Sequence, residues 1–365
     1  MNILVTGSEG FIAKNLIHHL KYTEHDILEF NRNTSSDLKN LVEKADVIFH
    51  LAGSNRPSND DGFLHDNVEL TGKLVDILCK SDSVKKVFFS SSIQASQNNM
   101  YGQSKLLAEN QFTKLAESKT IYYQILRLPN IFGKWCKPNY NSVVATFCYN
   151  IINGITLNVT DPKKVLNLLY IDDLVRYFLK NLEIELDKFL PEDFPIYKIS
   201  LGELEAKIKN FQENKDIVSN VGSGLERALF ATYLAYISPD SFSLPLELHS
   251  DPRGTFVEAF KTSKSGQISF FTAKPGITRG GHFHHTKNER FLVIHGSANF
   301  RFLNMDTQER YEIKVSAKQP IIVQTIPGWA HDITNIGQED LLVLLWANEI
   351  FDKNIPDTYM VDLGV

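Results

Sequence analysis

Two histidines lie two positions apart at His282 and His284, and Glu289 follows five residues after the second. In an extended strand, residues i and i+2 point to the same face, so both imidazoles can be directed at one point. The later segment Pro327-Gly-Trp-Ala-His331 supplies a third histidine. Three imidazoles and one carboxylate suit a first-row divalent metal that keeps an open coordination position. The spacing therefore predicts a metal site formed by His282, His284, Glu289 and His331, and we expect zinc first.

His285 directly follows His284 and points to the opposite face of a regular strand, so we leave it out of the ligand set. A β-bulge at this point would exchange the roles of the two residues. The alternative for the whole set is a polar strand in a half-exposed sheet that binds no metal. Short alternating segments separated by Gly, Asn and Asp surround the histidines, which predicts an antiparallel barrel or jelly roll.

A second candidate site begins the sequence, where a short apolar run leads into Thr6-Gly7-Ser-Glu-Gly10-Phe11-Ile12. This pattern predicts a strand, a tight turn and a helix. A glycine turn lets the backbone approach a pyrophosphate, which rests on the N-terminus of the helix. Gly7, Gly10, Phe11 and Ile12 are therefore candidate contacts of a dinucleotide cofactor. The alternative is an ordinary turn that contains two glycines.

The next predicted strand ends at Asn31-Arg32. An acid at this place favours NAD through the ribose hydroxyl, whereas an arginine accommodates the 2′-phosphate of NADP. Because Asn31 replaces the acid and Arg32 follows, we expect NADPH; the alternative is that Arg32 is only a solvated charge. Leu51, Ala52 and Gly53 end a later strand and are expected to line the cofactor.

The candidate catalytic group follows a strand that ends in three serines at Ser92. Tyr101 and Lys105 are four positions apart, so they share one face of a helix. A lysine ammonium near the phenol lowers its pKa, and the serine hydroxyl can share the proton. Ser92, Tyr101 and Lys105 are therefore predicted to protonate a carbonyl oxygen during reduction. Alone, this tyrosine–lysine spacing would indicate only a surface helix pair.

The chain of 365 residues is longer than the size at which single cores stop growing, roughly 250–300 residues. Residues 1–135 alternate between strand and helix, which predicts a doubly wound parallel sheet. A further helix is expected from Ile171 to Ile184, capped by Asp172. The segment from Ser238 to Pro245 is rich in proline and serine. We place the domain boundary there, with one domain at 1–243 and an all-β domain at 244–365.

Composition excludes several classes of function. A content of 43% hydrophobic and 22% charged residues is that of a globular protein. The net charge of −5 and the absence of a basic stripe argue against binding nucleic acid. No apolar run is long enough to span a bilayer, so we expect no membrane role. Cys79, Cys136 and Cys148 are an odd number of cysteines, which favours a reducing cytoplasm with all three thiols packed as small apolar groups.

Residues 1–240 resemble the extended short-chain dehydrogenase/reductases, which include nucleotide-sugar epimerases, dehydratases and reductases. The segments that carry the resemblance are Thr6–Ile12, His50–Gly53, Asn67, Ser90–Ser92, Tyr101 with Lys105, Arg127–Gly133 and Tyr170–Val175. The resemblance implies that Ser92 and Tyr101 contact the substrate carbonyl. It also implies that Lys105 contacts Tyr101 and the nicotinamide ribose.

The region around the histidines resembles the cupins, although Pro327 and Gly328 are adjacent where the second cupin motif usually separates them. Together with Asp251-Pro-Arg-Gly-Thr-Phe, it also resembles the sugar-nucleotide 3,5-epimerase branch of the cupin-like folds. In those relatives the histidine that matches His282 is a base without metal. Because His284 and Glu289 add ligands here, we expect His282 to bind the metal, which leaves the base unassigned.

The order of the two domains resembles a family of bifunctional capsular-polysaccharide enzymes over the whole chain. The resemblance implies that the cupin domain inverts C3 of a UDP-4-keto-6-deoxy-N-acetylhexosamine. The N-terminal domain would then reduce C4 with NADPH to a UDP-2-acetamido-2,6-dideoxy-talose type product, and we expect a cytoplasmic homodimer. Two alternatives remain: a 4-reductase whose cupin domain serves only dimerisation, and a sugar-binding or regulatory protein. The intact set of Ser92, Tyr101 and Lys105 argues against the second.

Overall fold

The computed structural model describes residues 1–34, 37–57, 59, 61–118, 121–213, 217–218, 223–246, 249–251, 254–256, 261–262, 266–349 and 352–364. It divides into two compact units. The first contains residues 1–131 and 166–198, and the second contains residues 132–165 and 199–365. The chain thus passes between the units more than once, and the division at 243/244 stays a prediction.

The first unit is built on a parallel sheet with the strand order β2-β1-β3-β4-β5. The strands are β1 Asn2–Thr6, β2 Asp26–Phe30, β3 Val47–His50, β4 Lys86–Ser92 and β5 Tyr122–Leu128. The helices are α1 Phe11–Leu20, α2 Leu38–Lys44, α3 Asp61–Phe63, the π-helix η1 Leu64–Glu69, α4 Leu70–Leu78, the 3₁₀-helix η2 Ile93–Ser96, α5 Met100–Ser118 and α7 Ile171–Leu182.

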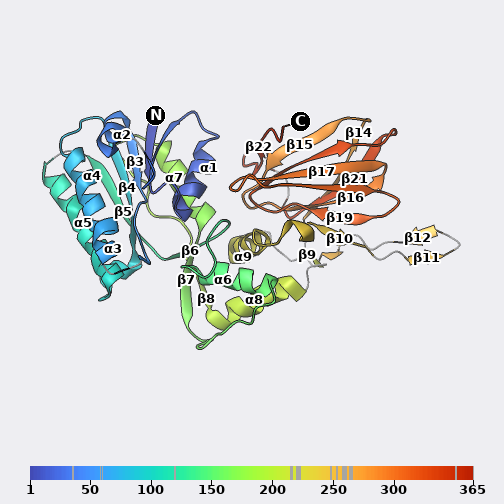
Figure 1. Cartoon of the computed structure of the whole chain (residues 1–365), viewed down its shortest axis with the longest axis horizontal. Helices are drawn as coiled ribbons and strands as arrows, with labels where there is room; N and C mark the ends of the chain where they lie inside the picture. The colour runs from blue at the N-terminus through green and yellow to red at the C-terminus, as the bar shows by residue number, and fades with distance from the viewer. Residues whose placement is uncertain are drawn as a thin grey trace. The chain divides into compact units, whose positions relative to one another are not determined.

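Helices cover both faces of this sheet: α2, α4 and α5 lie on one face, and α1 and α7 on the other (Figure 1). The predicted Rossmann-like, doubly wound fold is therefore confirmed. In such sheets a ligand binds beyond the carboxyl ends of the strands, where the strand order reverses. Here the reversal lies between β1 and β3, so the residues after Thr6 and His50 are placed to bind a ligand.

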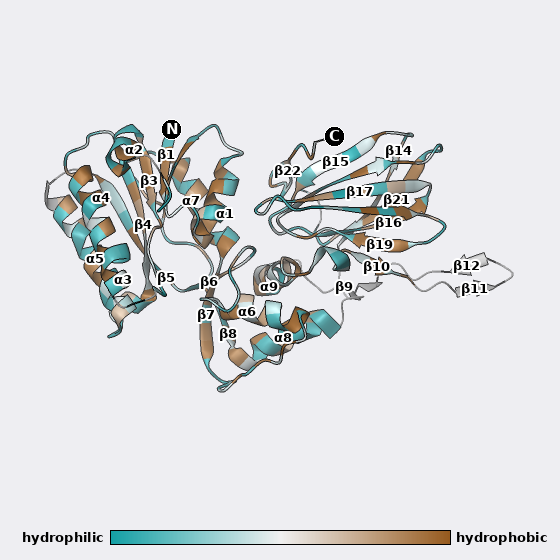
Figure 2. Cartoon of the chain, viewed as in Figure 1, coloured by the Kyte–Doolittle hydropathy of each residue, from teal (hydrophilic) through white to brown (hydrophobic). Residues whose placement is uncertain are grey.

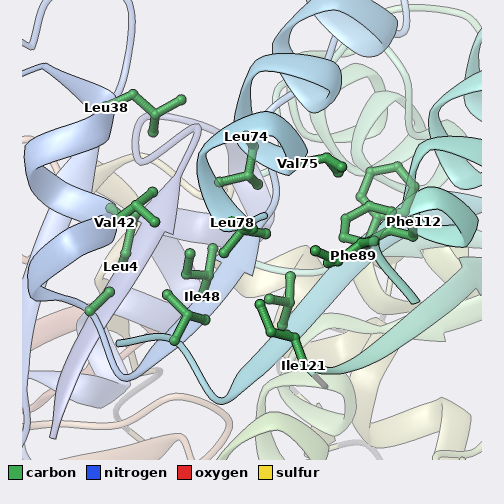
Figure 3. Close-up of a cluster of buried hydrophobic side chains, with 14 of the residues drawn as sticks. Leu4, Leu38, Val42, Ile48, Leu74, Val75, Leu78, Phe89, Phe112 and Ile121 are labelled. Atoms are coloured by element: carbon green, nitrogen blue, oxygen red, sulfur yellow. The ribbon is translucent and has the colours of Figure 1, made fainter. Parts of the chain in front are cut away.

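Apolar strand residues hold this unit together, and β1, β3 and β4 are correspondingly brown in Figure 2. Leu4, Ile48 and Phe89 are buried on the face that α2, α4 and α5 cover. Leu74 of α4 and Phe112 of α5 point into the same cluster (Figure 3). Burying such a side chain completely stabilises the folded state by about 1.5–3 kcal/mol. This cluster therefore fixes the strands whose carboxyl ends carry the candidate site.

Two antiparallel sheets form the β part of the second unit, with the orders β10-β19-β16-β21-β14 and β18-β17-β20-β15-β22. Their strands are β10 Ser243–Pro245, β14 Gln267–Ala273, β15 Thr278–Phe283, β16 Glu289–His295, β17 Ser297–Asn304, β18 Arg310–Ser316, β19 Ile321–Gln324, β20 Trp329–Asn335, β21 Leu341–Ala347 and β22 Tyr359–Met360. Buried Phe291 and Phe300 join the two sheets, with ring centroids 5.7 Å apart. The predicted cupin-like, all-β fold is confirmed.

The remaining elements complete the chain. They are the helices α6 Val143–Ile152, α8 Leu201–Glu213 and α9 Gly224–Leu234, the 3₁₀-helix η3 Pro239–Ser241, and the strands β6 Asn130–Phe132, β7 Val165–Tyr170, β8 Tyr197–Ser200, β9 Ile217–Val218, β11 His249–Asp251, β12 Gly254–Phe256 and β13 Lys261–Thr262. The predicted helix from residue 171 is present as α7, but Tyr170 is its N-cap and Asp172 lies in its first turn. Of the stretch Asp251–Phe256 used in the cupin comparison, residues 252–253 lie outside the described residues.

Among the described residues, no helix combines the length and apolar character needed to cross a membrane. The three cysteines are free thiols. Cys136 and Cys148 are buried as predicted, whereas Cys79 is only partly buried.

Candidate active site and metal centre

The glycine turn after β1 brings the backbone close to the end of β3. Gly7 has a φ of 69°, and a Cβ there would lie 2.7 Å from the Cα of Ala52. The Gly7 amide donates to the carbonyl of Phe30 at the end of β2. Helix α1 then begins at Phe11 with Gly10 as its N-cap, and no side chain caps it. The first amides of α1 therefore remain available to an anion such as a pyrophosphate.

A second close approach joins the segment after β3 to helix α5. A Cβ on Gly53 would lie 2.6 Å from Oδ1 of Asn67 and 3.1 Å from Nζ of Lys105. Only glycine leaves room for these two side chains. Leu51 and Ala52 precede it, so the three residues expected to line the cofactor lie between the glycine turn and Lys105.

Asn31 and Arg32 follow β2 as predicted. The Asn31 Nδ2 donates to the Ser8 hydroxyl at 2.9 Å, which ties the end of β2 to the glycine turn. The Arg32 guanidinium is 81% exposed and forms a 2.5 Å ion pair with Asp66. Asp66 could not be anticipated from the sequence, because its carboxylate reaches Arg32 from a helix more than thirty positions away. The charge of Arg32 is therefore partly balanced by Asp66.

Ser92, Tyr101 and Lys105 come together at the carboxyl end of β4. Ser92 is the last residue of β4, and its side chain hydrogen-bonds that of Tyr101. Burial raises the pKa of Tyr101, and the bond from Ser92 opposes that rise. The Lys105 ammonium donates to the carbonyl of Ser90 at 2.9 Å. The tyrosine is thus a protonated group that can donate a proton.

Burial lowers the pKa of Lys105 to about 8, and the charge of Glu109 opposes that fall. Glu109 lies one helical turn after Lys105 and was missed by the sequence analysis. It accepts hydrogen bonds from Ser91 and, through both carboxylate oxygens, from Arg127 at 2.6–3.2 Å. Glu109 therefore joins α5 to β4 and β5 and keeps Lys105 charged near neutral pH.

A buried chain of hydrogen bonds runs from the end of β1 to helix α5. Thr6 and Thr71 bond the two ring nitrogens of His50 at 2.8 and 2.9 Å, and burial lowers the pKa of His50 to about 3. Thr71 donates to the carbonyl of Asn67, so it accepts from His50 Nε2, and Nδ1 accepts from Thr6. The Asn67 amide in turn donates to Ser104 at 2.9 Å. A neutral histidine thus links β1, β3 and α5 at the cofactor site.

The four predicted metal ligands lie together in the second unit. His282 is in β15, His284 follows that strand, Glu289 opens β16 and His331 is in β20. One ligand atom from each lies within 4.8 Å of the others. The Glu289 Oε2 is 3.1 Å from Nε2 of His284, 3.4 Å from that of His331 and 4.0 Å from that of His282.

The electrostatics of this cluster suit a cation. Burial alone would raise the pKa of Glu289, but the three imidazoles that surround its carboxylate hold it well below its usual value. Burial lowers the pKa of His331 to about 4, so its imidazole is neutral near pH 7 and can act as a ligand. The His331 Nδ1 is buried and has no hydrogen-bond partner among the described residues. Three imidazole nitrogens and one carboxylate oxygen therefore fit the predicted divalent metal.

His285 points away from this cluster. Its ring packs on those of Phe283 and Tyr359, with centroids 5.0 and 4.8 Å away. The irregularity in β15 lies between Gly280 and His282, not at His284. The side chain of His282 is 20% exposed, whereas that of His284 is 1% exposed. The cluster is thus open on the side of His282.

The parallel sheet, the glycine turn and the grouping of Ser92, Tyr101 and Lys105 are the arrangement expected of a nicotinamide-dependent enzyme that acts on a carbonyl. Residues 3–196 match the NAD dependent epimerase/dehydratase family, and the chain belongs to this family. Residues 249–359 match the polysaccharide biosynthesis C-terminal domain.

Relatives that match the whole chain are more specific. A UDP-2-acetamido-2,6-beta-L-arabino-hexul-4-ose reductase from Pseudomonas aeruginosa is 47% identical, and the match covers 100% of this chain and 99% of the relative. The crystal structure of the capsular polysaccharide assembling protein CapF from Staphylococcus aureus is similar at 40% identity and a TM-score of 0.65. That match covers 99% of this chain and 100% of the other. The resemblance to capsular-polysaccharide enzymes is therefore confirmed.

The fold of part of the chain also occurs in a UDP-glucuronic acid 4-epimerase from Bacillus cereus, with a TM-score of 0.52 and 19% identity. That match covers 58% of this chain and 84% of the epimerase. At this identity the likeness shows the fold alone.

Proposed function

We propose that the chain is a bifunctional nucleotide-sugar enzyme of surface-polysaccharide synthesis. Residues 244–365 epimerise C3 of a UDP-4-keto-6-deoxy-N-acetylhexosamine, and residues 1–243 then reduce the C4 ketone with NADPH. The product is of the UDP-2-acetamido-2,6-dideoxy-talose type. The observation that carries the reductase part is the 47% identity, over the whole chain, to a hexul-4-ose reductase. The four-ligand cluster supports the epimerase part.

Reduction adds a hydride to C4 and a proton to the carbonyl oxygen. The reduced nicotinamide supplies the hydride when it is bound. Tyr101 donates the proton, and its raised pKa keeps it protonated at neutral pH until the oxygen becomes basic. Ser92 orients the tyrosine hydroxyl through their hydrogen bond. The Lys105 ammonium favours the phenolate that remains, because opposite charge stabilises the ionised form.

Epimerisation removes the proton at C3, which lies next to the ketone, and returns it to the opposite face. A divalent metal, for which zinc is our first candidate, supplies Lewis-acid stabilisation of the enolate oxygen when it is bound. His282, His284, Glu289 and His331 would hold it. Because His282 is the most exposed of the histidines, we place the substrate on its side. The same 4-keto group serves both steps, so one sugar nucleotide can be processed at both sites.

For the cofactor we propose NADPH over NADH. Asn31 occupies the place of the acid that binds the adenosine ribose, and Arg32 beside it offers a guanidinium to a 2′-phosphate. Arg32 forms an ion pair with Asp66, and its side chain is largely exposed. The guanidinium can therefore exchange the Asp66 carboxylate for a phosphate.

The test follows the UDP-2-acetamido-2,6-dideoxy-β-L-arabino-hexul-4-ose substrate by NMR in deuterated buffer. Without cofactor, we expect deuterium to enter at C3, and added NADPH should then give the reduced sugar. His284→Ala should stop exchange, whereas Tyr101→Phe should stop reduction and leave exchange intact. His295→Ala is the matched control, because His295 lies in β16 with an exposed side chain.

A parent protein that reduces the sugar without C3 exchange would instead support a 4-reductase whose cupin-like unit is structural. The name of the Pseudomonas relative, which specifies only a reductase, is the observation that favours this second candidate. A protein that neither exchanges nor reduces would contradict both candidates.

We also propose a homodimer that forms through β14. Among the described residues this strand pairs only with β21, so it is an edge strand. Its Ile268 and Phe270 side chains are 59% and 70% exposed on the same face of the strand. Exposed apolar edge strands tend to be covered by another chain. Light scattering should show a dimer that Phe270→Lys weakens, and an unchanged mass would contradict this surface.

A further inference from the structure

The turn between the second and third metal-binding candidates, residues 285–288, is buried but lies outside the strands. Its backbone amides need partners, because an unpaired buried amide costs about 1–3 kcal/mol. The carboxylate of Asp357 supplies three of them, and the Asn288 amide donates to the side-chain oxygen of Asn348 instead. Asp357 Oδ1 accepts from the amide of His285 at 2.9 Å, and Oδ2 accepts from those of Thr286 and Lys287 at 2.7 and 2.8 Å. Thr286 adds its hydroxyl to the same oxygen at 2.7 Å.

The backbone of Asp357 also bonds a metal-binding candidate directly. Its carbonyl oxygen accepts a hydrogen bond from Nδ1 of His284. Because a carbonyl can only accept, this bond requires a proton on Nδ1 of His284. The Nε2 of His284 is then the nitrogen that faces the cluster, 3.1 Å from the carboxylate of Glu289. Asp357 thus holds both the imidazole of His284 and the turn that leads to Glu289.

Neighbouring side chains fasten Asp357 to the turn. Arg227 of α9 donates to the Thr286 hydroxyl, pairs with Glu349 at 2.7 Å and lies 4.0 Å from the Asp357 carboxylate. On the other side, the Lys287 ammonium donates to the hydroxyl of Thr358 at 3.1 Å. The segment that contains Asp357 is therefore bound to the turn on both sides.

We propose that Asp357 is a positioning residue of the metal centre, which holds the imidazole of His284 and the turn to Glu289 in the geometry that binds the metal. The inference rests on the metal site of the proposed function. Partners behind a metal ligand commonly change metal affinity by about 10–100-fold when they are replaced. A residue that only closes a turn would change stability and leave affinity unchanged.

The test compares Asp357→Asn with the parent protein as full-length chains. Zinc affinity is measured by competition with a chromophoric chelator, and we expect a loss of about 10–100-fold. The second measurement is the ¹⁵N spectrum of the histidine side chains in metal-free protein. In the parent, Nδ1 of His284 should be protonated, and in the variant forms with an unprotonated Nδ1 should appear.

Asp352→Asn is the matched control, because Asp352 lies in the same C-terminal segment and its carboxylate accepts a hydrogen bond from the amide of Asn354, which is not part of the turn. It should leave both measurements unchanged. Zinc affinity of Asp357→Asn within two-fold of the parent, with unchanged protonation of Nδ1, would overturn the proposal and leave the metal site standing. A parent that binds no zinc would overturn both, and the chelator titration of the parent separates the two cases.

Discussion

Replacing Glu109 by glutamine should move the pH range in which the enzyme reduces its substrate. Burial lowers the pKa of Lys105 to about 8, and the negative charge of Glu109 is what opposes a larger fall. Glutamine keeps the shape and can still accept from Ser91, but it removes the charge. His50 also faces Lys105 and cannot compensate, because its pKa of about 3 leaves it neutral.

The size of the effect follows from the charged fraction of Lys105. An opposite charge at close range changes a pKa by about 1–3 units, so losing Glu109 should lower the pKa of Lys105 by about one unit or more. With a fall from about 8 to about 7, the charged fraction at pH 8 drops from about one half to about one tenth. The reduction rate should then fall about 5-fold at pH 8 and hardly change at pH 6.

The direction of the pH dependence follows from the role of the Lys105 ammonium. The pKa of Lys105 is lowered in the folded protein, so the ammonium is present below about pH 8 and is lost as the pH rises. The assay is cofactor oxidation with the 4-keto sugar between pH 6 and 9, for the parent, Glu109→Gln and Lys105→Met. The rate of Lys105→Met should not fall as the pH rises through about 8, because this variant has no ammonium to lose. The electrostatic reasoning would be refuted if Glu109→Gln lost the same fraction of its reduction rate at every pH. It would also be refuted if the fall in rate at high pH occurred at the same pH as in the parent.

Three further outcomes are expected. Tyr101→Phe should lower the reduction rate by about 10²–10⁴-fold, measured by cofactor oxidation, and a near-parental rate would exclude Tyr101 as the proton donor. Arg32→Ala should raise the KM for NADPH far more than that for NADH, while Asp66→Asn should lower the KM for NADPH because it frees the guanidinium; equal changes for both cofactors would contradict the 2′-phosphate contact. Elemental analysis should find about one equivalent of metal in the parent and none in His284→Ala, and retention of metal in the variant would remove His284 from the ligand set.

The sequence located residues correctly where the geometry that brings them together is local. Four-residue spacing brings Tyr101 and Lys105 to one helix face, and two-residue spacing brings His282 and His284 to one cluster, because each repeat is set by its own secondary structure. The strand–helix alternation likewise sufficed for the parallel sheet. The helix cap was wrong by two residues, since Tyr170 rather than Asp172 precedes α7.

The supporting residues could not be predicted in the same way. Asp357 reaches its turn from a segment about seventy positions away, and Asp66 reaches Arg32 across thirty-four. No periodicity marks such contacts, because they depend on how distant segments pack. Glu109 was within reach of a local argument, since it lies four residues after Lys105, but its role depends on the position of Arg127 in the neighbouring strand.

The route of the chain limits how this protein can be divided or exchanged. Its backbone crosses between the two units after residues 131, 165 and 198. Residues 132–165 supply helix α6, which packs with α8 and α9 from the later part of the chain. A gene fragment that ends at residue 198 would therefore contain α6 without its partners. One that ends at 243 would retain these helices but separate Arg227 from Thr286 and Glu349. Recombination at a single junction between distant relatives would break one of these sets of contacts, so the two units should be inherited together.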